Sequence, residues 1–178
     1  MTRRSMLRLT RTAAVLEAFN VCWLALLVFV VAGLPASIAN LVGYAVLGGL
    51  LFEGAAYWTL KHRQLRSGAR CPNGLVAFRV LRRVNEVVLA SVLVVLAIVA
   101  ARRPGLETWP GLAFLAFAGL EYINYFHVQL SHQSRADLRR LLRTRRLRTA
   151  HLATDLVRCR DRKRAARAAP GVSEASAG

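Results

Sequence analysis

The chain has 178 residues, of which 55% are hydrophobic, yet 26 lysines and arginines against nine acidic residues give it a formal net charge of +17. The apolar residues come in long blocks separated by arginine clusters, which excludes an ordinary soluble domain, where apolar residues recur in short amphipathic runs. The composition therefore predicts an all-α integral protein of the cytoplasmic (cell) membrane.

Four apolar blocks are long enough to cross a bilayer, which takes about 20 residues. The predicted spans cover residues 13–34, 36–60, 80–101 and 111–130, with a basic N-terminus at 1–12, a basic loop at 61–79 and a short outer turn at 102–110. A cleaved signal peptide is the alternative interpretation of the first block, with a small-residue cleavage site near Ser37. The hydrophobic sequence that resumes at Ile38 favours a permanent first span instead.

Basic residues concentrate in the N-terminus, in the loop at 61–79 and in the tail. The positive-inside rule then predicts four transmembrane helices with both termini in the cytosol, against the weaker opposing signal of Arg102 and Arg103. The second span carries two pairs of small residues four apart, Ala39 with Gly43 and Ala45 with Gly49. Such pairs let helix backbones approach closely in lipid, so we expect this helix to be central in a four-helix bundle.

After the fourth span, leucines at helical spacing alternate with arginines, which predicts a basic amphipathic cytosolic helix over 131–167, followed by a disordered tail at 168–178. Four of its arginines are the predicted contacts with the anionic inner leaflet: Arg139, Arg140, Arg143 and Arg146. Each basic residue near the headgroups contributes about 1 kcal/mol. A partner-binding helix is the alternative, and nucleic-acid binding is disfavoured because no aromatic residues are interleaved to stack on bases.

Three cysteines are far apart in the sequence and form no paired motif. Cys22 falls in the first predicted span, whereas Cys71 and Cys159 fall in segments predicted to be cytosolic. Thiols in that compartment are kept reduced, so the sequence predicts no disulfide.

Each predicted span contains one glutamate: Glu17, Glu53, Glu86 and Glu121. With the predicted orientation all four lie in the cytosolic half of the membrane, where they could converge on one polar cavity. An ionised group at the centre of a bilayer costs at least ~2.5 kcal/mol, so such residues usually face an interior and often have a function. The predicted site, with neighbouring polar residues added, comprises Glu53, Glu121, Asn124, Glu17, Asn20, Glu86 and Tyr57.

The glutamates differ in their local surroundings. Glu86 follows Arg82 and Arg83 by four and three residues, which predicts an interfacial ion pair. Glu17 is near a helix start, where the helix dipole favours an anion, so a structural role stays open for it. Glu53 and Glu121 lie deeper without a nearby arginine, and we expect these two to be functional.

Three functions would use this cluster. Desolvated carboxylates that lie close together take up protons near neutral pH, which suits binding or transport of a proton, a cation or a small amphiphile, and this is the favoured hypothesis. A membrane scaffold or assembly factor acting through the arginine-rich helix is the second. A metal-dependent enzyme is the third, with His127 and Glu121 as weak candidate ligands, but Asn124 stands where the Glu-x-x-His motif of di-metal bundles has its histidine.

The sequence favours a non-enzymatic role and predicts no cofactor. Because four short spans make a thin bundle, we expect a homo-oligomer or a partner membrane protein.

Overall fold

The computed structural model describes residues 3–72, 74–129 and 148–168, and within them the chain is almost entirely helical. Helix α1 spans Arg3–Ala25 and continues as a short π-helix, η1, at Leu26–Val31. The helices that follow are α2 (Ile38–Ser67), α3 (Leu75–Arg102), α4 (Trp109–Phe126) and α6 (His151–Ala168). Three stretches are long and apolar enough to cross a membrane: Arg3–Val31, α2 and α3.

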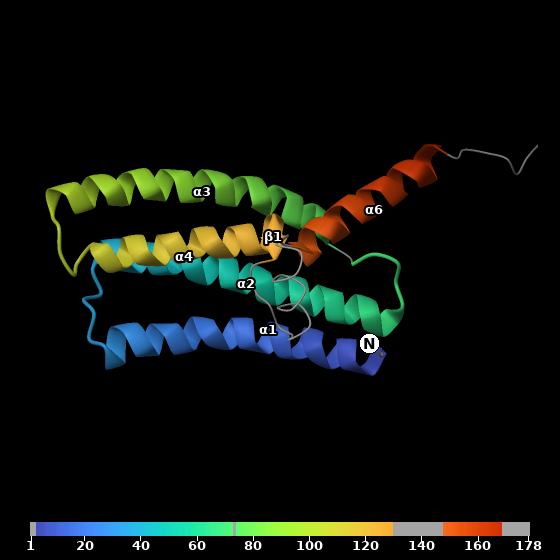
Figure 1. Ribbon diagram of the computed structural model, residues 1–178, viewed down its shortest axis with the longest axis horizontal. Helices are drawn as coiled ribbons and strands as arrows, with labels where there is room; N and C mark the ends of the chain where they lie inside the picture. Colours follow the sequence, from blue (N-terminus) through green and yellow to red (C-terminus); the bar gives the residue numbers. More distant parts are fainter. Residues whose placement is uncertain (1–2, 73, 130–147, 169–178) are drawn as a thin grey trace, which may run out of the picture.

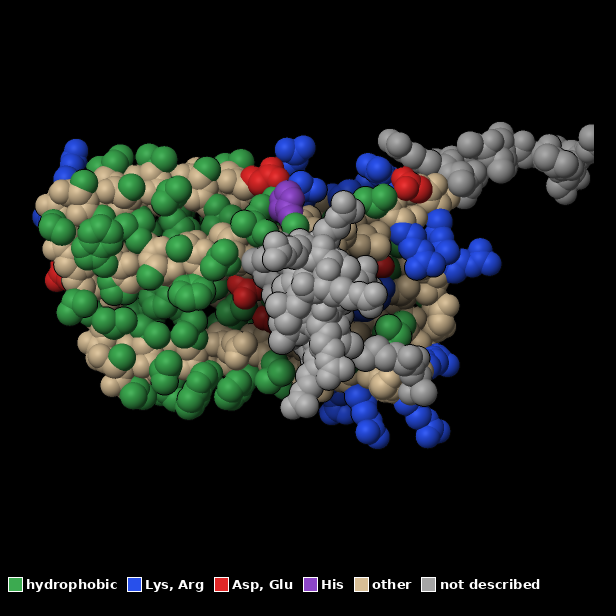
Figure 2. Space-filling view, viewed as in Figure 1, with side chains coloured by type: hydrophobic (Ala, Val, Ile, Leu, Met, Phe, Trp, Pro, Cys, Tyr) green, Lys and Arg blue, Asp and Glu red, His purple; other side chains and the backbone are tan. Residues whose placement is uncertain are grey.

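Helices α1 to α4 run side by side, with α4 between α3 and α2, and α2 between α4 and α1 (Figure 1). The N-terminus, the α2–α3 turn and α6 lie at one end of this bundle, which we call the basic end. Figure 2 shows apolar side chains over most of the helical body, whereas lysines and arginines gather toward the basic end. The shorter α4 packs against both α2 and α3, and the main core lies along the α2–α4 contact.

The helices extend further into the polar segments than predicted. Helix α1 begins at Arg3, and the predicted loop at 61–79 is reduced to the turn between Ser67 and Leu75. Arginine, lysine and glutamine favour helix, and the glycines at either side of the turn, Gly68 and Gly74, adopt positive φ angles that end one helix and precede the next. The guanidinium of Arg3 donates 3.0 Å hydrogen bonds to two carbonyls in the last turn of α2.

Helices α2 and α4 cross at glycines. A Cβ atom added to Gly43 would lie 2.1 Å from the carbonyl oxygen of Gly111, and one added to Gly111 would lie 2.4 Å from that of Ala39. This close approach confirms the packing role predicted for the Ala39/Gly43 pair. Gly49 of the second pair is exposed, and a Cβ atom added there would meet no described atom within 4 Å, so no helix approaches closely at that glycine.

Asn40 fixes the end of the bundle opposite the basic end. Its side chain is fully buried, donates to the carbonyls of Pro35 (2.9 Å) and Leu106 (2.8 Å), and accepts from the backbone amide of Gly111 (2.8 Å). One buried amide therefore joins the α1–α2 turn, the α3–α4 turn and the start of α4, with its polar atoms satisfied.

The segment after α4 differs from the single basic helix predicted over 131–167. Helix α4 ends at Phe126, short of the predicted boundary at 130. Strand β1 (Val128–Gln129) pairs antiparallel with β2 (Arg148–Thr149), and α6 begins only at His151. Strand pairing supplies hydrogen-bond partners for backbone groups that leave the helix, and helical spacing of leucines alone does not reveal it. The four predicted lipid-contact arginines, residues 139, 140, 143 and 146, lie outside the described residues.

The structure corrects the prediction for the cysteines. Cys71, in the α2–α3 turn, and Cys159, in α6, form a disulfide with their Cα atoms 6.0 Å apart. The two residues are 88 positions apart in the sequence, so only the docking of α6 onto the basic end brings them together. Cys22 is a free thiol, exposed on α1.

Candidate functional site

The four predicted glutamates make three different sets of contacts. They separate into a carboxyl pair between α1 and α4, a bridge from α2 to α3, and an ion pair at the α3–α4 contact.

Glu17 of α1 and Glu121 of α4 come together at the hydroxyl of Tyr125. Both carboxylates lie near this hydroxyl, and Glu121 is near enough to Glu17 for its negative charge to act on that carboxylate. The hydroxyl is buried and makes no hydrogen bond of standard geometry to a described residue. Glu17 and Glu121 are half-buried, so a shielded polar spot lies between the two helices. We call Glu17, Glu121 and Tyr125 the carboxyl pair site.

Gly54 of α2 makes room for this site. A Cβ atom at Gly54 would lie 2.2 Å from the hydroxyl oxygen of Tyr125, so any larger residue there would displace the ring. Tyr125 follows Glu121 by four residues and therefore points to the same face of α4. Three helices thus build the site, since α1 and α4 supply the carboxylates and α2 provides the space between them.

Asn124 and Asn20 have different positions relative to the pair. The Asn124 side chain donates to a carboxylate oxygen of Glu121 at 3.2 Å, as the Glu-x-x-Asn spacing predicts. Asn20 is exposed on α1. Among the described residues no lysine or arginine forms an ion pair with Glu17 or Glu121.

Glu53 belongs to a separate bridge. The side-chain amide of Asn85 donates to its carboxylate at 2.7 Å, which joins α2 to α3. A carboxylate that accepts a neutral amide hydrogen bond gains no compensating charge, so the bridge is polar without being an ion pair.

Glu86 forms the ion pair that the sequence predicts. Its carboxylate lies 3.4 Å from the guanidinium of Arg82 and 3.3 Å from that of Arg83, and it also accepts a 2.6 Å hydrogen bond from Tyr122. The exposed His127 lies 3.4 Å from the same Tyr122 hydroxyl. These contacts satisfy Glu86 locally and tie α3 to α4.

Tyr57 forms a hydrogen bond to α6, and not to one of the predicted glutamates. Its buried hydroxyl donates to Asp155 at 2.9 Å, and Lys61 pairs with the same carboxylate oxygen at 2.7 Å. No cluster of three or more potential metal ligands occurs in the part of the chain that the structure describes, and His127 and Glu121 make the separate contacts given above.

Sequence reasoning missed Tyr125, Gly54 and Asp155. Tyr125 had a usable signal, because it lies one helical turn from Glu121. Gly54 and Asp155 act through neighbours distant in the sequence, and helical periodicity carries no information about such partners. Comparison of the chain with known protein families, with curated proteins and with solved structures gave no match.

Proposed function

We propose that this is a four-span protein of the cytoplasmic membrane, with its basic end in the cytosol, that binds one proton at the carboxyl pair site and carries protons across the membrane by means of that site. The observation that carries the proposal is the meeting of Glu17 and Glu121 at Tyr125 with no ion pair to a described cation.

The charge of the site supports this choice. Two negative charges held close together at a half-buried position repel each other more strongly than they would in water. Sharing one proton between the two carboxyls removes that repulsion, as does an alkali cation held between them. The buried Tyr125 hydroxyl then has an acceptor on either side, because a singly protonated pair keeps unprotonated oxygens on both glutamates.

The placement of the site suits exchange with the cytosol. Glu17 lies six residues from Arg11, about 9 Å along a helix, so the pair is within the apolar part of α1 but close to its basic end. Helix α1 packs chiefly on α2. Where α1 comes near α4, the two carboxylates of the site, Glu17 and Glu121, lie near each other with like charges. Loading and release of the proton therefore change the force between α1 and α4, which is the kind of coupling that transport needs.

The test is proton flux into liposomes that contain the purified protein and an internal pH-sensitive dye, driven by a potassium diffusion potential. We expect Glu121→Gln to lower the flux about tenfold or more, since the amide cannot exchange a proton. Glu107→Gln is the matched control, because Glu107 is an exposed glutamate in the α3–α4 turn far from the site.

Equal flux in the native protein, Glu121→Gln and Glu107→Gln would remove the carboxyl pair from the mechanism, and absence of flux in the native protein would refute transport. Repeating the assay with a sodium gradient distinguishes an alkali cation from a proton as the bound species.

A further inference from the structure

Helix α6 is attached to the basic end through one face. Leu152, Asp155 and Cys159 recur at intervals of three and four residues and are all buried. This spacing places them on the same side of the helix. Leu152 and Cys159 join the main hydrophobic core, so the first part of α6 is docked onto the bundle, whereas its later part extends beyond it (Figure 1).

The noncovalent anchor is Asp155. Its carboxylate is buried and is held by Lys61 at 2.7 Å and Tyr57 at 2.9 Å, both from α2. The ring of Trp58 also packs edge-on against His151 with centroids 5.8 Å apart. These contacts position the first half of α6.

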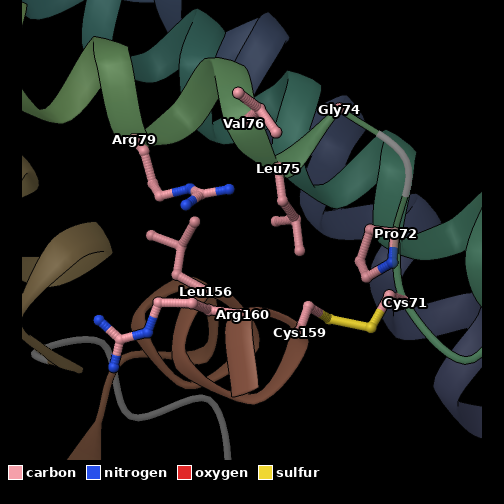
Figure 3. A pocket seen from close by; sticks show the side chains of 9 residues that line it. All are labelled: Cys71, Pro72, Gly74, Leu75, Val76, Arg79, Leu156, Cys159 and Arg160. Carbon is pink, nitrogen blue, oxygen red and sulfur yellow. A yellow bond between two sulfur atoms is a disulfide. The ribbon is translucent and has the colours of Figure 1, made fainter. Parts of the chain in front are cut away.

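The covalent anchor lies one turn further along. The Cys71–Cys159 disulfide ties α6 to the α2–α3 turn (Figure 3). A cavity of about 150 Å³, lined in part by both cysteines, Leu75, Leu156 and Arg79, lies beside it. The disulfide is therefore next to a cavity and is not enclosed on all sides by packed side chains.

The location of this disulfide is unusual for a permanent crosslink. It is at the arginine-rich end, which the positive-inside rule assigns to the cytosol, where cellular thiols keep structural disulfides from persisting. A disulfide on that side is typically one that forms and breaks in response to the redox state.

We propose that the Cys71–Cys159 pair is a reversible redox latch that fixes α6 on the basic end. Closing transfers two electrons and two protons from the two thiols to a low-molecular-weight disulfide, which is released as two thiols; opening is the reverse exchange with two thiols. In the open state α6 is held by its noncovalent contacts alone, which include Asp155 with Lys61 and Tyr57 and the hydrogen bond from Arg162 to the carbonyl of Arg70. This inference rests on the cytosolic placement of the basic end proposed above, and it does not depend on proton transport.

The experiment is hydrogen exchange, read by mass spectrometry, of the full-length protein in detergent micelles equilibrated with oxidised or reduced glutathione. We expect the α6 amides to exchange about tenfold faster in the reduced protein, because local opening no longer has to break the crosslink. Cys71→Ser is expected to show the fast exchange in both buffers. Cys22→Ser, which alters only the free thiol on α1, is expected to match the native protein.

Asp155→Asn separates the two anchors. With the disulfide formed, Asp155→Asn is expected to raise the exchange rate of the α6 amides by less than about threefold. With the disulfide reduced, the variant is expected to exchange about tenfold faster than the reduced native protein, because the noncovalent anchor is then the one that limits opening. Alkylation counts the free thiols in parallel, with one expected under oxidised glutathione and three under reduced glutathione. Three free thiols in both buffers, one in both, or redox-independent exchange of α6 would each overturn the proposal.

Discussion

Combining Glu17→Gln with Glu121→Gln is expected to lower proton flux no further than either substitution alone. Each single variant should reduce flux about tenfold, and two independent sites would then give about a hundredfold loss in the double variant. Non-additivity is expected here because both carboxylates act on the same Tyr125 hydroxyl and on each other, so removing either one already destroys the shared site.

Glu53→Gln is the matched control for this pair of substitutions. Its carboxylate accepts a hydrogen bond from Asn85, and the glutamine carbonyl can accept the same bond, so the α2–α3 bridge is preserved. We expect native flux in this variant when all proteins are measured in the same liposome assay. A hundredfold loss in the Glu17/Glu121 double variant, or a tenfold loss in Glu53→Gln, would show that the glutamates do not work as assigned.

Gly43→Ala is expected to be the most destabilising single-methyl substitution in the bundle, by about 3 kcal/mol, the upper end of the range for overpacking. The added Cβ would lie 2.1 Å from the carbonyl oxygen of Gly111, and a backbone atom cannot rotate away as a side chain can. The α2–α4 crossing would have to open, which also strains the Asn40 hydrogen bond to the Gly111 amide. Unfolding in mixed micelles, followed by circular dichroism, measures the loss.

Gly49→Ala provides the control on the same helix. Gly49 is exposed, and a Cβ atom added there meets nothing within 4 Å. Alanine is the better helix former by about 1 kcal/mol, so this variant should be as stable as the native protein or slightly more so. Equal destabilisation by the two substitutions would mean that the loss reflects glycine content rather than the α2–α4 crossing.

Features that depend on neighbours along one helix could be predicted from the sequence. The apolar stretches, the Glu86 ion pair with Arg82 and Arg83, and the Glu121–Asn124 contact follow from helical spacing and are present in the structure. The same reasoning could not choose between the two small-residue pairs of α2, because which face of a central helix meets a neighbour is decided by the whole bundle.

Contacts between segments distant in the sequence could not be predicted from it. The predicted single cavity assumed that glutamates at the same depth face one another, but rotation of each helix about its axis sends Glu53 toward Asn85 and Glu17 toward Tyr125. The Asp155 anchor and the Cys71–Cys159 disulfide depend on α6 folding back against the bundle, and no local pattern signals that return.

Infrared difference spectroscopy of the reconstituted protein tests the shared proton most directly. A protonated carboxyl has a carbonyl stretching band that an ionised carboxylate lacks, and transfer to heavy water shifts it. We predict such a band at neutral pH, in alkali-free buffer, with an intensity of one proton per chain, lost in both Glu17→Gln and Glu121→Gln and retained in Glu107→Gln. A native protein without the band, or a band that survives in either pair variant at full intensity, would contradict the shared proton.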